Sequence, residues 1–384
     1  MAQSPLPLKP MADQAFRPQA IDPTERLNRL RLIRSANIGP VSYFQLLSRF
    51  GNAAQALEAL PELARRGGGR TVRIADLKAV ETEIAAIDRL GAAYLFLGET
   101  GYPPALAELA NAPPVLSWRG SLERLSRPMV SIVGARNASA GACRFARQLA
   151  MDLASEGITV VSGLARGIDT AAHIGALQQA TIGVIASGID ISFPPENAEL
   201  QEKIATDHLL IAEQPPGTEP LARHFPYRNR IIAGLSLGTV VVEAAPRSGS
   251  LITARLAAEY GREVLAVPGS PLDARAQGCN GLIRDGATLI QNAGDVIESI
   301  RPLDTRAVRD FTLRYTDTAP APQPDPDDSE RQRIESLLSY SATSIDELVR
   351  QSGVNASAVQ LVLLELELAG RIERHAGAKV SLRG

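Results

Sequence analysis

The pattern of apolar and polar positions divides the chain into three folded stretches. Residues 25–60 and 74–91 carry apolar side chains three or four positions apart, as in Leu27, Leu30 and Ile33, which predicts short amphipathic helices. A Gly39-Pro40 break separates two of these helices, because proline begins a helix rather than continuing one. The first extended segments follow at 93–98 and 113–120. The chain therefore opens with a small helical domain.

From residue 128 the pattern changes to short apolar runs that alternate with helical segments. The runs have the composition of strands that are buried on both faces, and they lie at 129–134, 158–163, 181–187, 208–213, 238–245 and 262–269. Helical spacing fills the intervals at 138–157, 168–180, 228–236 and 250–261. Alternating strands and helices form βαβ units, so we predict a Rossmann-like α/β core with a doubly wound, mainly parallel sheet.

The end of the chain has a third pattern. Residues 317–330, DTAPAPQPDPDDSE, are rich in proline and acid, which is typical of a solvated linker. Helical patterns at 331–339, 344–353 and 355–370 then precede two predicted strands at 371–377 and 379–384, the outline of a winged helix. The predicted organisation is a disordered tail (1–24), a helical domain (25–100), the α/β core (101–302), a linker (303–329) and a winged-helix domain (330–384).

Composition narrows the classes of function. The chain has 384 residues, 45% of them apolar, which suits two or three globular domains. Its net charge of −2 means that a nucleic-acid partner needs a local basic site. Cys143 and Cys279 are too few for a disulfide framework or a zinc site. The N-terminus is polar, and no apolar run reaches the roughly 18 residues of a membrane helix, which favours a cytoplasmic protein without a membrane partner.

Several predicted loops combine glycine with arginine where a strand gives way to a helix. They lie at 134–141, 162–173, 223–236 and 246–255. Ligands of an open α/β sheet bind beyond the carboxyl ends of its strands, near the free N–H groups of helix N-termini. Glycine lets those amides approach an anion, and a guanidinium adds a planar, bidentate donor. A simple turn explains any one glycine, but the recurrence of arginine at these loops favours an anion-binding groove.

The familiar nucleotide-binding and hydrolytic motifs are missing from these loops. There is no P-loop, Gly134 does not open a dinucleotide fingerprint, and the predicted strand at 158–163 lacks the acid that would bind a ribose. The sequence contains neither G-x-S-x-G nor H-E-x-x-H. Asp169 is expected to cap a helix and interact with the positive end of its dipole, and Glu243 is an isolated carboxylate, so neither is a good candidate for acid–base catalysis. We therefore predict a binding protein, not an enzyme, with no cofactor, metal or catalytic residue.

The stretch RHFPYRNRIIAGLS, at 223–236, indicates which anion is bound. It sets Phe225 and Tyr227 among arginines, on a predicted loop that contains no acid. Single-stranded nucleic acid requires this combination, because guanidinium groups bind phosphate and each ring that stacks on a base contributes about 1–3 kcal/mol. The alternative interpretation places Phe225 in the core and uses Asn229 and Arg230 to fix the helix that follows.

The order of further motifs resembles the DprA/Smf family of bacterial DNA-processing proteins. The matching stretches span about residues 102–290 and are YPPALAEL, PPVLSWRG, SIVGARNAS, VSGLARGIDTAAH, FPYRNRIIAGLS, SGSLITARLAAEYGREVLAVPG and GCNGLIRDGA. This resemblance implies a non-catalytic protein that binds and protects incoming single-stranded DNA during natural transformation and loads the RecA recombinase onto it. It also implies a homodimer formed through the core. Residues 31–51 resemble the sterile-alpha-motif or helix-hairpin-helix-like domain of longer members, and the C-terminal part resembles their winged helix.

The same resemblance implies which residues bind DNA. Arg136 matches the pocket arginine after the first strand of the core, and Phe225 matches the aromatic residue of the family's F-P-x-R-N-R motif. Arg223 lies nearest to the basic residue that precedes this motif in the family. The full predicted set is Arg136, Ser162, Gly163, Arg166, Gly167, Arg223, Phe225, Arg228, Asn229, Arg230, Ser250 and Thr253.

Two other functions stay open at this point. The core also resembles Rossmann-like nucleotide phosphoribohydrolases, although residues 245–254, APRSGSLITA, lack the glutamate of their P-G-G-x-G-T-x-x-E motif. A second alternative is a regulator whose winged helix binds duplex DNA while the core senses a nucleotide. From residue 330 on, seven Arg/Lys face seven Asp/Glu, and this balance gives little support to duplex binding.

Overall fold

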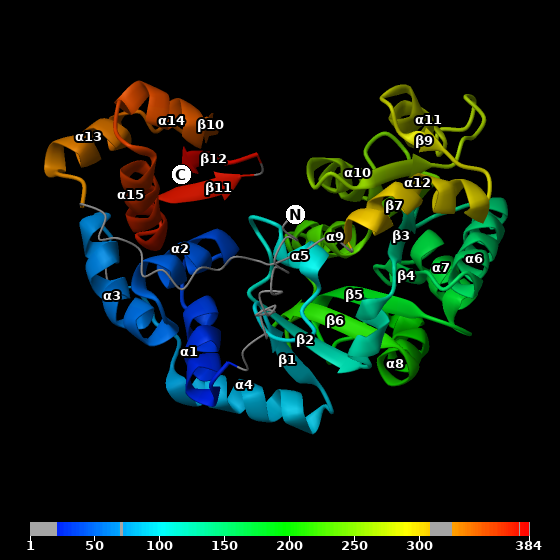
Figure 1. Ribbon diagram of the computed structural model, residues 1–384, viewed down its shortest axis with the longest axis horizontal. Helices are drawn as coiled ribbons and strands as arrows, with labels where there is room; N and C mark the ends of the chain where they lie inside the picture. Colours follow the sequence, from blue (N-terminus) through cyan, green and yellow to red (C-terminus); the bar gives the residue numbers. More distant parts are fainter. Residues whose placement is uncertain (1–20, 70–71, 308–324, 376, 384) are drawn as a thin grey trace, which may run out of the picture.

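A nine-stranded sheet forms the larger part of the structure, on the right of Figure 1. The computed structural model describes residues 21–69, 72–307, 325–375 and 377–383. In chain order the strands are β1 (Ala93–Phe96), β2 (Val115–Gly120), β3 (Met129–Gly134), β4 (Thr159–Ser162), β5 (Thr181–Gly188), β6 (Leu209–Gln214), β7 (Gly238–Val242), β8 (Glu263–Ala266) and β9 (Thr288–Leu289). They are arranged as β1-β2-β6-β5-β4-β3-β7-β8-β9, parallel from β6 to β9 and antiparallel at β1 and β2. The predicted mainly parallel, doubly wound sheet is confirmed; the short edge strand β9 was not predicted.

The direction of strand addition reverses between β3 and β7. From β3 the chain adds β4, β5 and β6 on one side, then returns to the other side of β3 and adds β7, β8 and β9. Parallel strands place their carboxyl ends at one edge, so the loops that follow β3, β4, β5 and β7 all open there. The loops after β3 and β7 lead away from each other, and such a switch point is where open α/β sheets bind their ligands.

Helices cover both faces of the sheet. Alternate residues of β3 point into two different apolar clusters: Val130 and Ile132 into one, Met129 and Val133 into the other. The first cluster is covered by α6 (Ala140–Ser155), α7 (Ile168–Ala176) and α12 (Ala293–Ala307). The second is covered by α5 (Pro104–Ala107), α9 (His224–Leu235), α10 (Ser250–Glu259) and α11 (Gln277–Arg284). A further helix, α8 (Ala198–Asp207), contributes Ile204 and Ala205 to the core around β5 and β6.

Helix α9 begins earlier than its sequence pattern suggests. We predicted a loop before residue 228, whereas the helix starts at His224 and contains Phe225 and Pro226 in its first turn. Proline is tolerated there, because the first N–H groups of a helix have no acceptor within it. Phe225, Arg228 and Asn229 therefore lie at helical spacing, on one face of a single element.

The N-terminal part is helical, as predicted. It contains α1 (Pro23–Arg34), α2 (Pro40–Phe50), α3 (Ala53–Arg66) and α4 (Leu77–Arg89), and Pro40 opens α2 at the predicted break. Helices α1 and α4 join an apolar cluster with Tyr94 and Phe96 of β1. Although we placed β1 with the helical domain, it forms an edge of the central sheet. Residues 1–20 of the predicted tail lie outside the described residues, and α1 already begins within the stretch 21–24.

The C-terminal part is a winged helix, also as predicted. It consists of α13 (Asp328–Ser336), β10 (Thr343–Ser344), α14 (Ile345–Ser352), α15 (Ala356–Leu368), β11 (Ile372–His375) and β12 (Lys379–Leu382). Its small sheet has the order β10-β12-β11, and β10 was not predicted. Of the predicted linker, residues 308–324 lie outside the described residues. At its ends α12 runs to Ala307 and α13 starts at Asp328.

The winged helix packs on the N-terminal helical domain rather than on the sheet that precedes it in sequence (Figure 1). Leu361, Leu364 and Leu368 of α15 share an apolar cluster with helices α2 and α3. The backbones approach so closely that a Cβ atom on Gly67 would lie 2.1 Å from the carbonyl oxygen of Glu365. In helix-turn-helix proteins the second helix of the motif enters the major groove, and in this chain that helix is α15. Its outer face is covered, so α15 is not free to bind duplex DNA in this arrangement.

Candidate nucleic-acid interface

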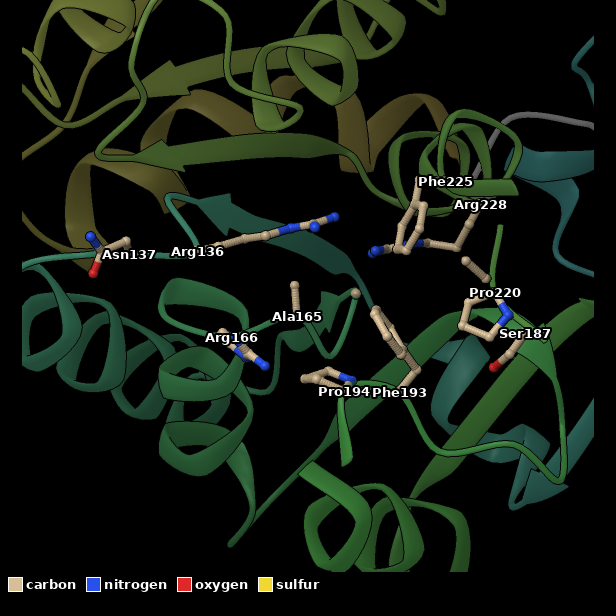
Figure 2. Close-up of a pocket in the computed structure, with 12 residues that line it drawn as sticks. Arg136, Asn137, Ala165, Arg166, Ser187, Phe193, Pro194, Pro220, Phe225 and Arg228 are labelled. Atoms are coloured by element: carbon tan, nitrogen blue, oxygen red, sulfur yellow. The ribbon is translucent and has the colours of Figure 1, made fainter. Parts of the chain in front are cut away.

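Two adjoining cavities lie at the carboxyl edge of the sheet, where the predicted loops meet. The first, which we call the aromatic pocket, has a volume of about 380 Å³ and is lined by Phe193, Phe225, Arg136, Arg166, Arg228 and their neighbours (Figure 2). The second, the switch-point cavity, has a volume of about 790 Å³ and lies between the loops after β3 and β7. Arg136, Phe225 and Arg228 line both cavities. The two cavities together form one groove, which we call the cationic groove.

Two phenylalanine rings give the aromatic pocket its shape. Phe193 follows β5 and Phe225 belongs to the first turn of α9; their ring centroids lie 6.1 Å apart, with the planes inclined at 60°. Phe193 is 42% exposed, and Phe225 is half-buried. The Arg136 guanidinium lies 5.0 Å from the centroid of the Phe225 ring and extends across the pocket towards it (Figure 2). Phe225 is therefore not sealed in the core, and both rings are open to a ligand.

Arg228 lies beneath Phe225 as a buried charge. Only 6% of its surface is exposed, and its guanidinium carbon lies 5.9 Å from the Phe225 ring centroid. Burial lowers the pKa of Arg228 to about 10, so the side chain remains charged at neutral pH. The nearest carboxylate, Asp169, is 3.9 Å away, and the Arg228 Nε has no hydrogen-bond partner among the described residues. A buried cation with incomplete partners favours an anionic or carbonyl-bearing ligand.

Asp169 organises the loop that follows β4. Its carboxylate accepts hydrogen bonds from the backbone N–H groups of Gly163, at 3.1 Å, and Ala165, at 3.3 Å. Burial raises the pKa of Asp169, and the facing Arg228 opposes this shift. A residue larger than glycine at position 163 would displace Arg228, because a Cβ atom there would lie 1.2 Å from Nη1 of Arg228. Gly167 has a φ of 76°, and its backbone approaches the Ala135 carbonyl in the loop after β3.

Two further exposed arginines of the predicted set, Arg166 and Arg223, occupy different places. Arg166 lines the aromatic pocket and forms an ion pair with Glu196 at 2.5 Å. Arg223 is exposed at the N-cap of α9, two residues before Phe225, and lies outside the linings of both cavities. Its long side chain is thus a candidate for a contact outside the groove rather than within it.

Three predicted residues from α9 and α10 belong to the switch-point cavity. Asn229, Ser250 and Thr253 are all buried and line it. The Asn229 amide donates to the Gly249 carbonyl at 3.4 Å, which ties α9 to the start of α10. The N-terminus of α10 therefore opens into this cavity, with the Ser250 hydroxyl 2.7 Å from that of Ser248.

Two predicted residues are turned away from the groove, and we remove them from the proposed DNA contacts. The Ser162 side chain is wholly buried and donates to the Ile132 carbonyl at 2.6 Å, so it joins two strands. Arg230, 3% exposed, donates to the Asn111 carbonyl at 2.6 Å and pairs with Glu213. At 100° per residue, Arg230 lies far around α9 from Phe225, whereas Arg228 and Asn229 share the Phe225 face.

Other lining residues were not predicted. Phe193 and Pro194 come from a segment, 188–194, that contains no arginine, the residue that marked the other loops. Arg247 lies in a loop that we did mark, but we selected only the later Ser250 and Thr253 from it. Arg275, after β8, lies between the recognised motifs. Two more guanidinium groups therefore line the switch-point cavity than the sequence suggested.

The described residues were also searched for metal ligands and membrane helices. No group of three or more histidine, cysteine, aspartate or glutamate side chains in the described ranges is placed to hold a metal ion. Within the same ranges, no helix combines the length and the apolar character needed to cross a membrane.

Comparison with known proteins identifies relatives of all three parts. Residues 93–301 match the family described as DNA recombination-mediator protein A, 23–86 match a DprA-like N-terminal HHH domain, and 318–378 match a DprA winged helix domain. The DNA processing protein DprA of Streptococcus pneumoniae is 48% identical over 198 residues, covering 51% of this chain and 70% of that protein. Protein Smf of Escherichia coli is 37% identical over 290 residues, covering 73% and 75%.

Solved structures give the same relationship. The crystal structure of DprA from Streptococcus pneumoniae superposes with a TM-score of 0.61 at 37% identity, covering 71% of this chain and 96% of that one. A structure of DNA processing protein A from Helicobacter pylori, described as giving insight into a single-stranded DNA binding mode, has a TM-score of 0.50 at 30% identity. It covers 56% of this chain and 96% of the Helicobacter chain.

Proposed function

The chain belongs to the DprA/Smf family of DNA recombination-mediator proteins, and from that premise we propose that it binds single-stranded DNA in the cationic groove. The observation that carries this proposal is the position of Phe225, half-buried and within 6 Å of both the Arg136 and Arg228 guanidinium groups. Unpaired nucleic acid offers bases that stack on rings and phosphates that bind guanidinium groups. A duplex keeps its bases stacked on one another and offers no free base to such a ring.

The size of the aromatic pocket suits a single base. Its volume of about 380 Å³ lies at the small end of the roughly 300–1,000 Å³ typical of small-molecule sites. Phe193 and Phe225 supply apolar surface, and the buried Arg228 supplies N–H donors for a carbonyl or a phosphate. Every base presents a ring face, and thymine, cytosine and guanine also present carbonyl oxygens. This composition supports binding that tolerates many sequences.

The switch-point cavity suits the sugar–phosphate backbone next to that base. Arg247 and Arg275 line it, and the N-terminus of α10 opens into it. Helix N-termini bind phosphate through free N–H groups and the helix dipole. We propose that one strand crosses the wall formed by Arg136, Phe225 and Arg228, with a base on one side and a phosphate on the other.

We further propose that this protein protects the bound strand and loads the RecA recombinase onto it during natural transformation. In this proposal it acts as a homodimer in the cytoplasm. Support for these steps comes from family membership and not from a feature of the groove.

We also propose that the protein has no catalytic activity. Asp169, the carboxylate among the described residues that line the groove, is already engaged by backbone N–H groups and Arg228, and Glu243 at the switch point is engaged by Ser139. A phosphoribohydrolase needs a carboxylate free to act on its substrate. The regulator alternative needs an accessible α15, and that helix is covered by the N-terminal domain.

A titration of oligo-dT, duplex and mononucleotide against the full chain tests the proposal. We expect oligo-dT to bind tightest, with log K falling against log salt by about 0.7 for each phosphate neutralised. Arg136→Ala should weaken binding and lower that slope, whereas Arg284→Ala, at an exposed position on α11, should change neither. Preferred binding of duplex, release of free base from a mononucleotide, or wild-type binding by Arg136→Ala would each count against the proposal.

A further inference from the structure

Glu243 stands at the switch point in an unusual conformation. It directly follows β7, is half-buried and has a φ of 48°, in the left-handed region that favours glycine. Such a conformation costs a non-glycine residue on the order of 1–3 kcal/mol and persists where the surrounding structure holds it. Residues of this kind cluster at functional sites, so the contacts of Glu243 are informative.

Its carboxylate spans the gap between the loops after β7 and β3. One oxygen, Oε2, accepts from the Ser139 backbone N–H at 2.8 Å, and Oε1 accepts from the Ser139 hydroxyl at 2.6 Å. The same hydroxyl oxygen accepts from the Ala142 N–H at 3.1 Å and so caps α6. One side chain therefore joins the end of β7 to the segment 135–139, just before α6.

That segment carries Arg136. At its end the Ser139 carbonyl accepts the Cys143 N–H at 3.0 Å, the first backbone bond of α6, but its backbone bonds to other elements are long: Ala135 N–H to the Val242 carbonyl at 3.4 Å, and Ile168 N–H to the Ala135 carbonyl at 3.3 Å. No ion pair holds the Arg136 side chain within the described part of the chain, and its guanidinium reaches over Phe225 instead. The two bonds to Glu243 are thus shorter than the backbone bonds that join this segment to β7 and α7.

The charge of Glu243 makes its position notable. The cationic groove contains Arg136, Arg247 and Arg275, and Glu243 interacts electrostatically with Arg275. A carboxylate beside a phosphate site weakens phosphate binding through its charge alone. Geometry rather than charge must therefore account for any benefit that Glu243 brings to binding.

We infer that Glu243 is a positioning residue for DNA binding, one that holds the 135–139 segment so that Arg136 stays over Phe225. This inference rests on the proposed function and makes a prediction opposite in sign to that of simple electrostatics. If only charge mattered, removing the carboxylate would tighten binding of an anion. If Glu243 acts through position, removing it loosens the Arg136 segment and weakens binding.

Two substitutions separate these effects in the full-length protein. Glu243→Ala removes both acceptors, and we expect affinity for oligo-dT to fall about tenfold and the salt slope to fall by about 0.7, the loss of one phosphate contact. Glu243→Gln keeps an amide oxygen that accepts from the Ser139 N–H and removes the charge, so it should bind at least as tightly as wild type. Glu298→Ala, which loses the same charge at an exposed site on α12, is the matched control.

A double-mutant cycle and hydrogen exchange complete the test. In the Arg136→Ala background, Glu243→Ala should lower the affinity for oligo-dT little further, because both changes remove the same contact between Arg136 and DNA. Amide exchange at residues 135–139 should rise in Glu243→Ala and stay low in Glu243→Gln, with or without DNA. Tighter binding by both variants, or full additivity with Arg136→Ala, would overturn the inference. If the wild-type protein fails to bind oligo-dT, the proposed function falls, and unchanged exchange in Glu243→Ala would separately refute the positioning role.

Discussion

Replacing Gly163 with alanine tests the floor of the aromatic pocket. A Cβ atom at this position would lie 1.2 Å from Nη1 and 2.3 Å from Cζ of Arg228, so the whole guanidinium must move. Arg228 is buried, with Asp169 on one side and the pocket on the other. The nearest free volume is the pocket itself. We expect the displaced guanidinium to occupy the space that we assign to a base.

The expected loss of affinity follows from the interactions with a base that displacement of the Arg228 guanidinium removes. Loss of the pocket for a base, including its stack on Phe225, removes about 1–3 kcal/mol of binding free energy. Since 1.4 kcal/mol corresponds to a factor of ten, affinity for oligo-dT should fall roughly 5- to 150-fold. Forcing a methyl group into this packed site should also lower the free energy of unfolding by about 1–3 kcal/mol. The variant is thus expected to fold but to bind poorly.

Fluorescence anisotropy with labelled oligo-dT, together with a thermal melt, measures both quantities. Gly281→Ala is a suitable control, because Gly281 lies inside α11, where an added methyl group would meet no atom within 4 Å beyond the helix's own backbone, and alanine favours helix. It should leave affinity unchanged. Wild-type affinity in a folded Gly163→Ala protein would show that Arg228 and the pocket it borders do not contribute to binding.

Three further predictions concern separate parts of the molecule. Phe193→Ala should weaken oligo-dT binding by about 1–3 kcal/mol while leaving the salt slope unchanged, because a ring carries no charge; a changed slope in a salt titration would contradict this. Burial lowers the pKa of His173 to about 3 from 6.5, so as the pH falls the unfolded state binds a proton before the folded state does. The free energy of unfolding should therefore fall by up to about 1.4 kcal/mol per pH unit as pH drops from 6.5 to 3. His173→Asn should flatten this dependence in denaturant titrations. Leu364→Ala should destabilise the contact between α15 and the N-terminal domain by about 2–5 kcal/mol, and calorimetry should show a lower melting temperature. Substitution of the exposed Tyr340 by alanine, the control, should leave the melting temperature unchanged.

The sheet was predictable because its strands are buried on both faces. Runs such as MVSIVG and TIGVIAS have the uninterrupted apolar character that only a covered sheet requires, and the helices between them have the opposite, amphipathic pattern. The start of α9 was not predictable by the same means. Its first turn contains Phe225, Pro226 and Tyr227, a composition typical of a loop. Proline fits there because the N–H groups of the first turn of a helix have no acceptor within the helix.

The site was predictable as a place more than as a set of side chains. Loops that follow parallel strands meet at one edge whatever their residues, so the convergence of Arg136, Gly163 and Phe225 follows from topology. The direction of each side chain depends on helical phase and on partners elsewhere in the chain. Arg230 is drawn away by Glu213 and Asn111, and no local pattern predicts those partners.

The docking of the winged helix did leave a signal in the sequence. Residues 355–370, NASAVQLVLLELELAG, are apolar on more than one face, as expected for a helix that is covered on both sides. One face packs inside the winged helix through Val359, Val362 and Leu363, and the other packs on the N-terminal domain. A helix that reads a DNA groove instead exposes a polar, basic face, and this helix has none to expose.

The burial of the groove arginines bears on how a chain with a net charge of −2 can hold a polyanion. Arg136 and Arg247 are exposed, so salt screens them, and they give binding its ionic-strength dependence. Arg228 is shielded from solvent, and its attraction to a bound anion is screened much less. Asp169 lies 3.9 Å from Arg228 and does not fully pair it, and the same carboxylate oxygen, Oδ2, also accepts hydrogen bonds from two backbone N–H groups. The groove therefore combines exposed arginines, whose charges salt screens, with the buried Arg228, whose charge it screens much less. This strong local attraction compensates for the overall positive charge that the chain lacks.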